Sequence, residues 1–434
     1  MKNTFVLLAL IVMNSFAFSQ KELTLDQAVV IAMENNYDIR IVSNSVEVAE
    51  NNQSVKNSGY LPTVAVSAGG NYSNNNATIE TQAGVEQTIT GIEANSYNAS
   101  IGVNYVLFNG MNRKNAFEKL KRSYDLANVQ RQVQIDNTIL AVYNAYYELA
   151  KSDIMQAILQ ESFEISQNRL RRLEYQKEFG QTTSLEILNA QVDMNNDSMS
   201  MVNGLLANEN ARRNLNYLLG FPADELVQVD RKVDVSTLLD FNTLSANMLE
   251  NNSTAKQFEL NKELANYDLK TSQSGWMPTV STNVSYGLNN ANNGPASFLA
   301  RQNITGLNAG VNLTWNIFDG GATSTRVANA KIAVDNQNLY KEQIDLSLKN
   351  QLANAWASYM NQLAVINFEE TNVEVSEQNF LKTEEQYKLG QVNSTDFRQA
   401  QLNLINARVN LETAKFNVKI AEAQLKMLEG TLVQ

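Results

Sequence analysis

The chain has 434 residues and a formal net charge of −11, and it contains neither cysteine nor histidine. The absence of cysteine excludes disulfides and thiol nucleophiles, and the absence of histidine excludes His-based triads, proton relays and Cys/His metal sites. The acidic balance argues against a nucleic-acid partner. We therefore expect no enzyme, with no catalytic residues, no cofactor and no metal. The length calls for two or more units, or for one elongated unit.

The N-terminus has the pattern of an export signal. Lys2 precedes an apolar run at residues 5–13, and Ala17-Phe18-Ser19 supplies the small residues that predict cleavage after Ser19. The run is too short for the alternative, an N-terminal membrane anchor. Residues 1–19 are therefore interpreted as a signal peptide, and no later apolar stretch has the length of a transmembrane helix.

The rest of the chain is predicted to be an internal duplication. GYLPTV at residues 59–64 recurs as GWMPTV at residues 275–280, 216 positions later. Helical segments are expected before each copy, over residues 25–56 and 241–272, and both contain Glu-Asn-Asn. The predicted boundaries are a first repeat at 20–220, a connecting segment at 221–240 and a second repeat at 241–434.

After each proline, apolar residues alternate with small or polar ones. This alternation predicts four strands, at about 62–74, 96–108, 278–290 and 303–318. A period of two over roughly ten residues, with aromatic residues toward the strand ends, is typical of transmembrane β-barrels. A half-buried hairpin of a soluble protein would show a similar pattern.

Each strand pair is bounded by residues that suit a change of backbone direction. Pro62 and Pro278 are expected at junctions from helix to strand, because proline ends a helix. Gly110 and Gly320 are expected at junctions from strand to helix, where glycine permits a sharp turn. Beyond these glycines the repeats are offset by 210 positions, so we place six extra residues in the loop of the first hairpin.

Two long helix hairpins are predicted, at residues 111–220 and 321–430. In each, a long segment without proline stops at a Gly-Gln pair, Gly180-Gln181 or Gly390-Gln391, and a second helix returns. A helix of about seventy residues is about 100 Å long. It needs lateral partners to be stable, so a bundle or a helical barrel is implied.

Four strands in one chain cannot close a barrel, and an open sheet edge in lipid leaves backbone groups without partners. Pooling the strands of three copies gives twelve, which is enough to enclose a lumen. The expected fold class is an α+β membrane protein. It is a trimeric 12-stranded β-barrel, with four strands per protomer, continued by a long α-helical periplasmic barrel.

Taken together, these motifs resemble the outer-membrane efflux proteins of the TolC family over nearly the whole chain after Ser19. The resemblance rests on the order and spacing of the doubled Leu/Met-Pro-Thr-Val, Phe-Asp-Gly-Gly at 318–321, the two Gly-Gln turns and Leu-Glu-Gly-Thr-Leu at 428–432. It implies a homotrimer in outer-membrane lipid whose helical tunnel meets a periplasmic adaptor (membrane fusion) protein and an inner-membrane pump. Segments 25–56 and 241–272 would form a belt around that tunnel.

The resemblance also suggests a pore constriction. In the family, acidic residues six and nine positions after the second turn glycine line it, and here those positions hold Asp396 and Gln399. One carboxylate is therefore present and the other is replaced. The alternative for Asp396 is an ordinary acid in the first turn of a helix, which the helix dipole favours. Glu186 is the equivalent residue in the first repeat and a third candidate.

The two helix turns are candidates for contact with the adaptor, as the resemblance implies. The residues concerned are Gly180, Gln181, Gly390 and Gln391. The glycines could instead serve only to reverse the chain, and the two roles are compatible. Before the first turn lie three arginines that either form a solvated face or pair between helices, and the sequence does not distinguish these possibilities: Arg169, Arg171 and Arg172.

The expected function is that of an outer-membrane exit duct in a tripartite efflux system that exports small molecules. Two alternatives stay open. One is the outer-membrane duct of a type I protein-secretion system, which would have the same architecture. The other is an exported coiled-coil structural protein without a pore. The composition does not identify the transported substrate.

Overall fold

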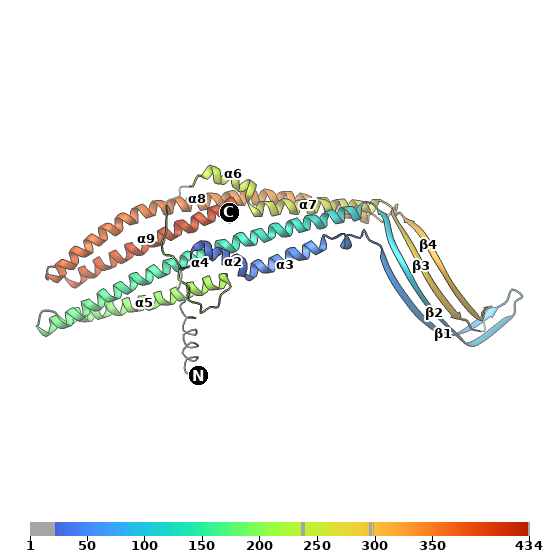
Figure 1. The fold of residues 1–434 in the computed structure, drawn as a ribbon, viewed down its shortest axis with the longest axis horizontal. Coiled ribbons are helices and arrows are strands. Elements are labelled where there is room, and N and C mark those ends of the chain that lie inside the picture. Colours follow the sequence, from blue (N-terminus) through green and yellow to red (C-terminus); the bar gives the residue numbers. More distant parts are fainter. Residues whose placement is uncertain (1–21, 236–238, 295–296, 298, 433–434) are drawn as a thin grey trace, which may run out of the picture. The chain divides into compact units, whose positions relative to one another are not determined.

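The computed structural model describes residues 22–235, 239–294, 297 and 299–432 (Figure 1). The predicted signal peptide, residues 1–19, lies outside the described residues. The chain divides into two compact units, which are described separately. The sheet unit comprises residues 46–127 and 258–340, and the hairpin unit comprises the described residues up to 45, 128–257 and those from 341 onward. Each unit takes segments from both predicted repeats, so the repeats are not the units of packing.

The helices occur in pairs of matching length. α4 (Asn112–Glu178) and α8 (Ala322–Lys388) each have 67 residues, and α5 (Ser184–Leu219) and α9 (Ser394–Glu429) each have 36. The shorter helices are α2 (Leu25–Asn35), α3 (Tyr37–Asn52), α6 (Phe241–Asn251) and α7 (Ser253–Gln273), with 3₁₀ turns at Val55–Asn57 and Ser274–Trp276. None of the described helices is long and apolar enough to cross a membrane.

The sheet unit contains one antiparallel sheet in the order β1-β2-β3-β4 (Figure 1). Its strands are β1 (Thr63–Glu80), β2 (Glu86–Asn109), β3 (Thr279–Asn292) and β4 (Arg301–Thr314). The β2–β3 pairing joins the two repeats. The predicted fold class, α+β with four strands per chain and long helices built by duplication, is confirmed.

The two faces of the sheet differ in polarity. One row crosses all four strands and is apolar, namely Val66, Ile101, Tyr286 and Leu307. The next row faces the other way and is small or polar, namely Ser67, Ser100, Gly287 and Gly306. The apolar side chains are uncovered in the single chain, where Val66 is 76% and Leu307 is 67% exposed. The alternation in the sequence therefore separates an apolar face from a polar one.

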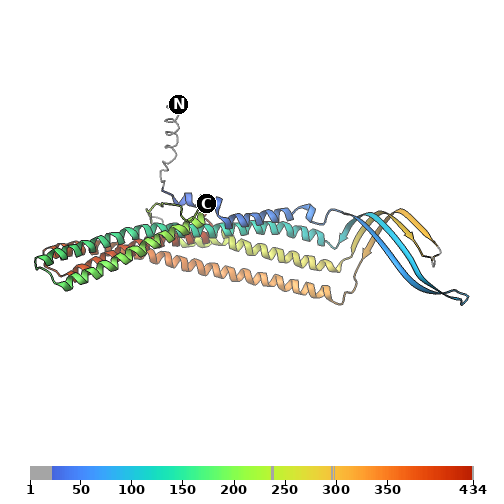
Figure 2. The ribbon, with the colours of Figure 1, turned by 90° about the horizontal axis from the view of Figure 1, so that it is seen from below.

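The first hairpin differs from the expectation. The alternation in the sequence predicts strand ends near residues 74 and 96, whereas β1 continues to Glu80 and β2 begins at Glu86 (Figures 1 and 2). Polar cross-strand contacts replace apolar alternation there: the hydroxyls of Thr78 and Thr88 are 3.1 Å apart. A register shift between Asn75 and Ala77 also interrupts the pattern that predicted the strand. The extra residues thus lengthen the strands rather than the loop.

The four junction residues lie in the sheet unit. Pro62 and Pro278 immediately precede β1 and β3, but helices α3 and α7 end earlier, and a 3₁₀ turn follows each of them. Gly110 and Gly320 have φ values of +65° and +68°, which favour glycine. At Gly110 space is also limiting, because a Cβ there would lie 2.7 Å from both the Ser274 carbonyl oxygen and the Met277 Cβ.

The four hairpin helices lie side by side in the hairpin unit, in the order α8-α9-α4-α5 (Figure 1). Side chains join the neighbours: Arg408 of α9 pairs with Glu377 of α8 and with Glu161 of α4. Apolar packing adds to this, as Phe416 of α9 lies against Tyr147 of α4 with ring centroids 6.1 Å apart. The four helices therefore form a layer, and α5 and α8 are its two edges.

In both repeats a buried asparagine binds the C-terminal end of the second hairpin helix, α5 or α9, in the same way. The buried Asn36 amide donates to the Leu218 carbonyl of α5 (2.9 Å), and its oxygen accepts from the backbone N–H groups of Asp38 and Ile39 at the start of α3. Asn252, 216 positions later, repeats this arrangement. It donates to Leu428 of α9 (3.0 Å) and accepts from the first N–H groups of α7. These two equivalent asparagines thus make equivalent contacts in the two repeats.

We predict that Asn36→Ala and Asn252→Ala each lower the free energy of unfolding by about 2 kcal/mol, because each removes a helix cap and leaves a buried carbonyl without its donor. Thermal and denaturant unfolding of the detergent-solubilised protein would measure this. The neighbouring Asn35→Ala is the control, since Asn35 is exposed and keeps its Cβ in alanine. A loss in the control as large as that in Asn36→Ala would contradict the assignment.

Candidate functional site

The turns between the long and the returning helices are built alike. Gly180 (φ +69°) donates to the Lys177 carbonyl, and Gln181 donates to that of Gln176. The second turn has the same pair of hydrogen bonds, from Gly390 (φ +74°) to Tyr387 and from Gln391 to Gln386. This is the Schellman ending of a helix, which satisfies its last carbonyls and needs a left-handed residue.

Glu186, the candidate in the first repeat, is used locally. Thr183 caps α5, its hydroxyl accepts from the Glu186 N–H (3.2 Å), and the Glu186 carboxylate accepts from the Thr183 N–H (3.4 Å). The Thr182 hydroxyl donates to the same carboxylate. This capping box holds the Glu186 side chain against its own helix.

Asp396 occupies the equivalent position of α9 but is not part of the cap. The Asn393 side chain caps this helix by accepting from the N–H groups of Thr395 and Asp396, both at 2.9 Å. The Asp396 side chain is exposed, and its carboxylate has no hydrogen-bond or ion-pair partner among the described residues. The carboxylate is therefore available to face a solvent-filled space, although its place in the first turn also suits the helix dipole.

Gln399 lies one turn further along α9 and is exposed. Its amide donates to Asn403 of the same helix (2.8 Å). Asp396 and Gln399 are thus on one helix, and Glu186 is on another. No group of three or more acidic side chains among the described residues could hold a metal ion.

A buried cluster of ionic and polar side chains joins three helices close to the turns. Arg398 of α9 donates two hydrogen bonds, of 2.7 and 2.8 Å, to the two carboxylate oxygens of Asp197 on α5. The buried Ser166 of α4 donates to Asp197 as well, and Arg169 of α4 pairs with Asp193 of α5. The side chains of Arg398 and Asp197 are only 12% and 9% exposed. Two arginines balance two aspartates, as burial requires.

Gln401, which is 1% exposed, extends the cluster along α9. Its amide donates to the Ser162 carbonyl (3.1 Å) and the Ser166 hydroxyl (3.3 Å) of α4. The α4–α5 and α8–α9 hairpins are therefore joined by directed polar bonds and not only by apolar packing. Sequence reasoning did not identify Arg398, Asp193 or Asp197. Arg169 was the one member of the cluster that the sequence suggested as a possible pair between helices.

The three arginines before the first turn behave differently from one another. Arg169 is buried and pairs between helices. Arg172 donates to the Lys388 carbonyl at the end of α8 (3.0 Å) and lies over the Tyr387 ring. Arg171 is exposed. Two of the three therefore contact other helices, and one lies on a solvated face.

Comparisons with known proteins agree with this architecture. The family model for outer membrane efflux proteins matches residues 28–221 and 244–431. A comparison with curated protein sequences finds no match. Among solved structures, the Campylobacter jejuni CmeC outer membrane channel is similar with a TM-score of 0.79 at 16% identity, covering 94% of this chain and 86% of that one.

Two further channels are similar in fold. VceC, an outer membrane protein of Vibrio cholerae, gives a TM-score of 0.75 at 14% identity, covering 94% of this chain and 96% of that chain. The open state of the Neisseria gonorrhoeae MtrE outer membrane channel gives 0.75 at 18% identity, covering 94% and 89%.

The fold and the two matched segments define a protein of the outer-membrane channel class. The chain belongs to the outer membrane efflux protein family, and the resemblance found in the sequence is confirmed. Its place is the outer membrane, with a helical extension into the periplasm, and its role is that of an efflux-type duct. Since the family consists of pore proteins, the prediction that the chain is not an enzyme is confirmed. The same finding removes the alternative of a structural protein without a pore.

We predict that Asp197→Ala lowers the free energy of unfolding by about 3 kcal/mol, because it leaves two buried arginines, Arg398 and Arg169, with a single carboxylate, that of Asp193. Unfolding in detergent would measure the loss. Arg408→Ala is the control, since it breaks a more exposed pairing with Glu161 and Glu377 and should cost about 1 kcal/mol or less. Equal losses in the two variants would show that burial does not determine the cost.

Proposed function

We propose that three copies of the chain form a twelve-stranded barrel in the outer membrane, continued by a helical periplasmic tunnel, as the exit duct of a tripartite efflux system. Membership of the outer membrane efflux protein family carries this proposal. The open sheet supports it. Among the described residues β1 and β4 each pair on one side only, and unpaired backbone groups are not tolerated in lipid. A ring of three sheets gives every edge a partner.

The polarity of the sheet supports the same assembly. The face that bears Val66, Tyr286 and Leu307 would contact lipid, and the face that bears Ser67 and Ser100 would line the lumen. A soluble protein would cover the apolar row with its own core. Among the described residues no element does so, since these side chains are more than half exposed except for Ile101 at 49%.

At the periplasmic end, the two turns are proposed to meet an adaptor protein that links the duct to an inner-membrane pump. Phe179 and Leu389, which precede the turn glycines, are 76% and 67% exposed. Exposed apolar side chains at a chain reversal suit a partner surface. Gln181 and Gln391 follow the glycines and add amide groups to the same turns.

Asp396 is proposed to line the constriction of the tunnel. Three copies around a threefold axis would form one ring of carboxylates, which favours cations and binds multivalent cations. Its free carboxylate supports this role, in contrast to that of Glu186, which the capping box retains. Gln399 would contribute amides rather than a second acidic ring.

We predict small, cation-selective conductance steps from the purified protein in planar bilayers, with block by a trivalent cation. Asp396→Asn should weaken this block by roughly tenfold or more, because it removes the charge of the whole ring. Glu186→Gln is the matched control. Glutamine still fits a capping box, so the block should stay as in the unmodified protein. Unchanged block in Asp396→Asn would remove Asp396 from the constriction while keeping the duct.

The class of cargo needs a separate experiment, because a type I secretion duct would share this architecture. A strain without the gene should accumulate a fluorescent efflux dye, and its set of secreted proteins should stay the same. Reintroducing the gene should restore export. The loss of a secreted protein with unchanged dye accumulation would assign the duct to protein secretion.

A further inference from the structure

Among the described residues, one contact between helices of the two repeats has no counterpart elsewhere in the chain. In the hairpin unit, α4 of the first repeat packs against α9 and the start of α7 of the second. The duplication relates α4 to α8, α9 to α5, and α7 to α3. Asn36 and Asn252 show that equivalent positions can keep equivalent contacts. The missing contact would therefore join α8 to α5 and α3, which lie at opposite edges of the layer (Figure 1).

The contact inside the chain fixes a register for the missing one. Phe416 packs on Tyr147, and Arg398 reaches Ser166, along two antiparallel helices. The counterparts of these residues in the other repeat lie 210 positions away. Phe416 and Tyr147 correspond to Leu206 and Ala357, and Arg398 and Ser166 correspond to Leu188 and Ser376, so each of these pairs is expected to meet. These positions are far apart within one copy of the layer, but they can meet between two copies.

Both edges carry apolar stripes that this register brings together. Six exposed residues on α5 follow one another at intervals of three, four or seven positions, namely Leu185, Leu188, Val192, Met199, Val202 and Leu206. The facing stretch of α8 has four, namely Met360, Phe368, Val375 and Leu381. Spacing of this kind is typical of helices that pack side by side. Large apolar stripes on a single copy indicate a protein partner.

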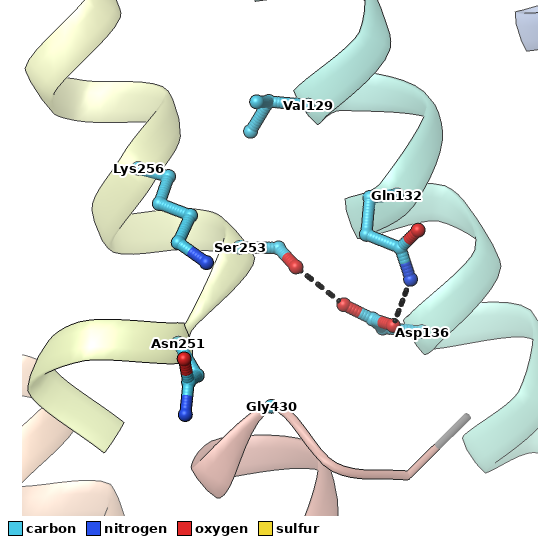
Figure 3. Close-up of a pocket in the computed structure, with 7 residues that line it drawn as sticks. All are labelled: Val129, Gln132, Asp136, Asn251, Ser253, Lys256 and Gly430. Carbon is cyan, nitrogen blue, oxygen red and sulfur yellow. Dashed lines mark hydrogen bonds between the residues drawn. The ribbon is translucent and has the colours of Figure 1, made fainter. Parts of the chain in front are cut away.

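A second part of the contact lies in a cavity of about 340 Å³ shown in Figure 3. There the Ser253 hydroxyl of α7 donates to the Asp136 carboxylate of α4 (2.8 Å). The Gln132 amide donates to the same carboxylate (2.9 Å), and Lys256 lies on the opposite wall. The cavity thus lies where α4 of the first repeat meets the start of α7 of the second.

The counterparts of these residues are complementary to each other. Asp136 and Ser253 correspond to Leu346 and Tyr37, which are 70% and 65% exposed, so a polar pair is replaced by an apolar one. Gln132 and Lys256 correspond to Glu342 and Arg40, which carry opposite charges. Both are exposed, and neither has an ion-pair partner among the described residues.

We propose that α8 of one copy packs against α3 and α5 of the next in the register of the α4–α7–α9 contact, with Leu346 on Tyr37 and Glu342 beside Arg40. This inference rests on the proposed trimer and specifies its helical interface. The contact is heterologous, because each copy offers a different edge to each neighbour. Such a contact forms a ring when the rotation from one copy to the next is one third of a full turn, as in the proposed trimer.

The chain has no cysteine, so paired cysteines would report this contact directly. In outer membranes, Tyr37→Cys with Leu346→Cys should oxidise to a ladder of covalent dimer and trimer. The counterpart pair, Asp136→Cys with Ser253→Cys, should cross-link within one chain and leave its mass unchanged on a denaturing gel. A disulfide needs Cα atoms within about 7 Å, which makes the assay specific.

A displaced pair tests the register. Asn361 is exposed and lies 15 residues beyond Leu346 on α8, about 22 Å away along the helix. Tyr37→Cys with Asn361→Cys should therefore give no ladder. A ladder from this pair and none from the matched pair, in variants that still form conducting trimers, would overturn the interface and leave the function standing. Monomers without conductance in the cysteine-free protein would instead contradict the proposed function.

Charge exchange gives an independent measurement. Arg40→Glu and Glu342→Arg should each lower the detergent concentration at which the trimer dissociates, because each places like charges together. The combined exchange should restore that concentration. If the two decreases in detergent concentration simply add in the double variant, Glu342 does not pair with Arg40 and the proposal is overturned.

Discussion

Backbone groups at the edge of a β-sheet need hydrogen-bond partners, and in lipid only another strand can supply them. The four-stranded sheet has two such edges, at β1 and β4. This constraint accounts for why one chain is not a complete duct. It also explains the uncovered row of Val66 and Leu307, which contributes nothing to the stability of a single copy in water and would face lipid in the proposed ring.

Duplication solves the corresponding problem for the helices. In the proposed trimer the outer edges of two similar hairpins match each other, so copies of one chain can surround a channel. The two repeats have nevertheless diverged where their surroundings differ. Inside the chain, the contact between repeats uses Asp136 with Ser253, and the uncovered counterpart positions hold Leu346 and Tyr37. The turns diverge as well, since Glu186 closes a capping box and Asp396 does not.

The sequence predicted much of this fold because its signals are local. Strict alternation, proline-free stretches and Gly-Gln turns determine strands, long helices and chain reversals. The sequence did not predict the ends of β1 and β2 near the hairpin turn, because strand residues there are rich in Asn and Thr and do not alternate with apolar ones. The cluster of Arg398, Asp197 and Asp193 was missed for another reason. Its members come from different helices, and nothing along the chain shows that they are buried together. The roles assigned to Asp396 and the turns came from resemblance, and they stay predictions.

The longer first hairpin shows where this architecture tolerates changes in chain length. At its base Thr63 pairs with Asn104, and at the base of the second hairpin Thr279 pairs with Thr314, which is the same register in both repeats. The pairing of β2 with β3 ends at Asn95 and Asn292, whereas β1 and β2 stay paired as far as Glu80 and Glu86. Insertions or deletions at that tip therefore leave the rows below unshifted. The outer rim can vary in height and sequence independently of the pore beneath it, which leaves it open to adaptation where the cell meets its surroundings.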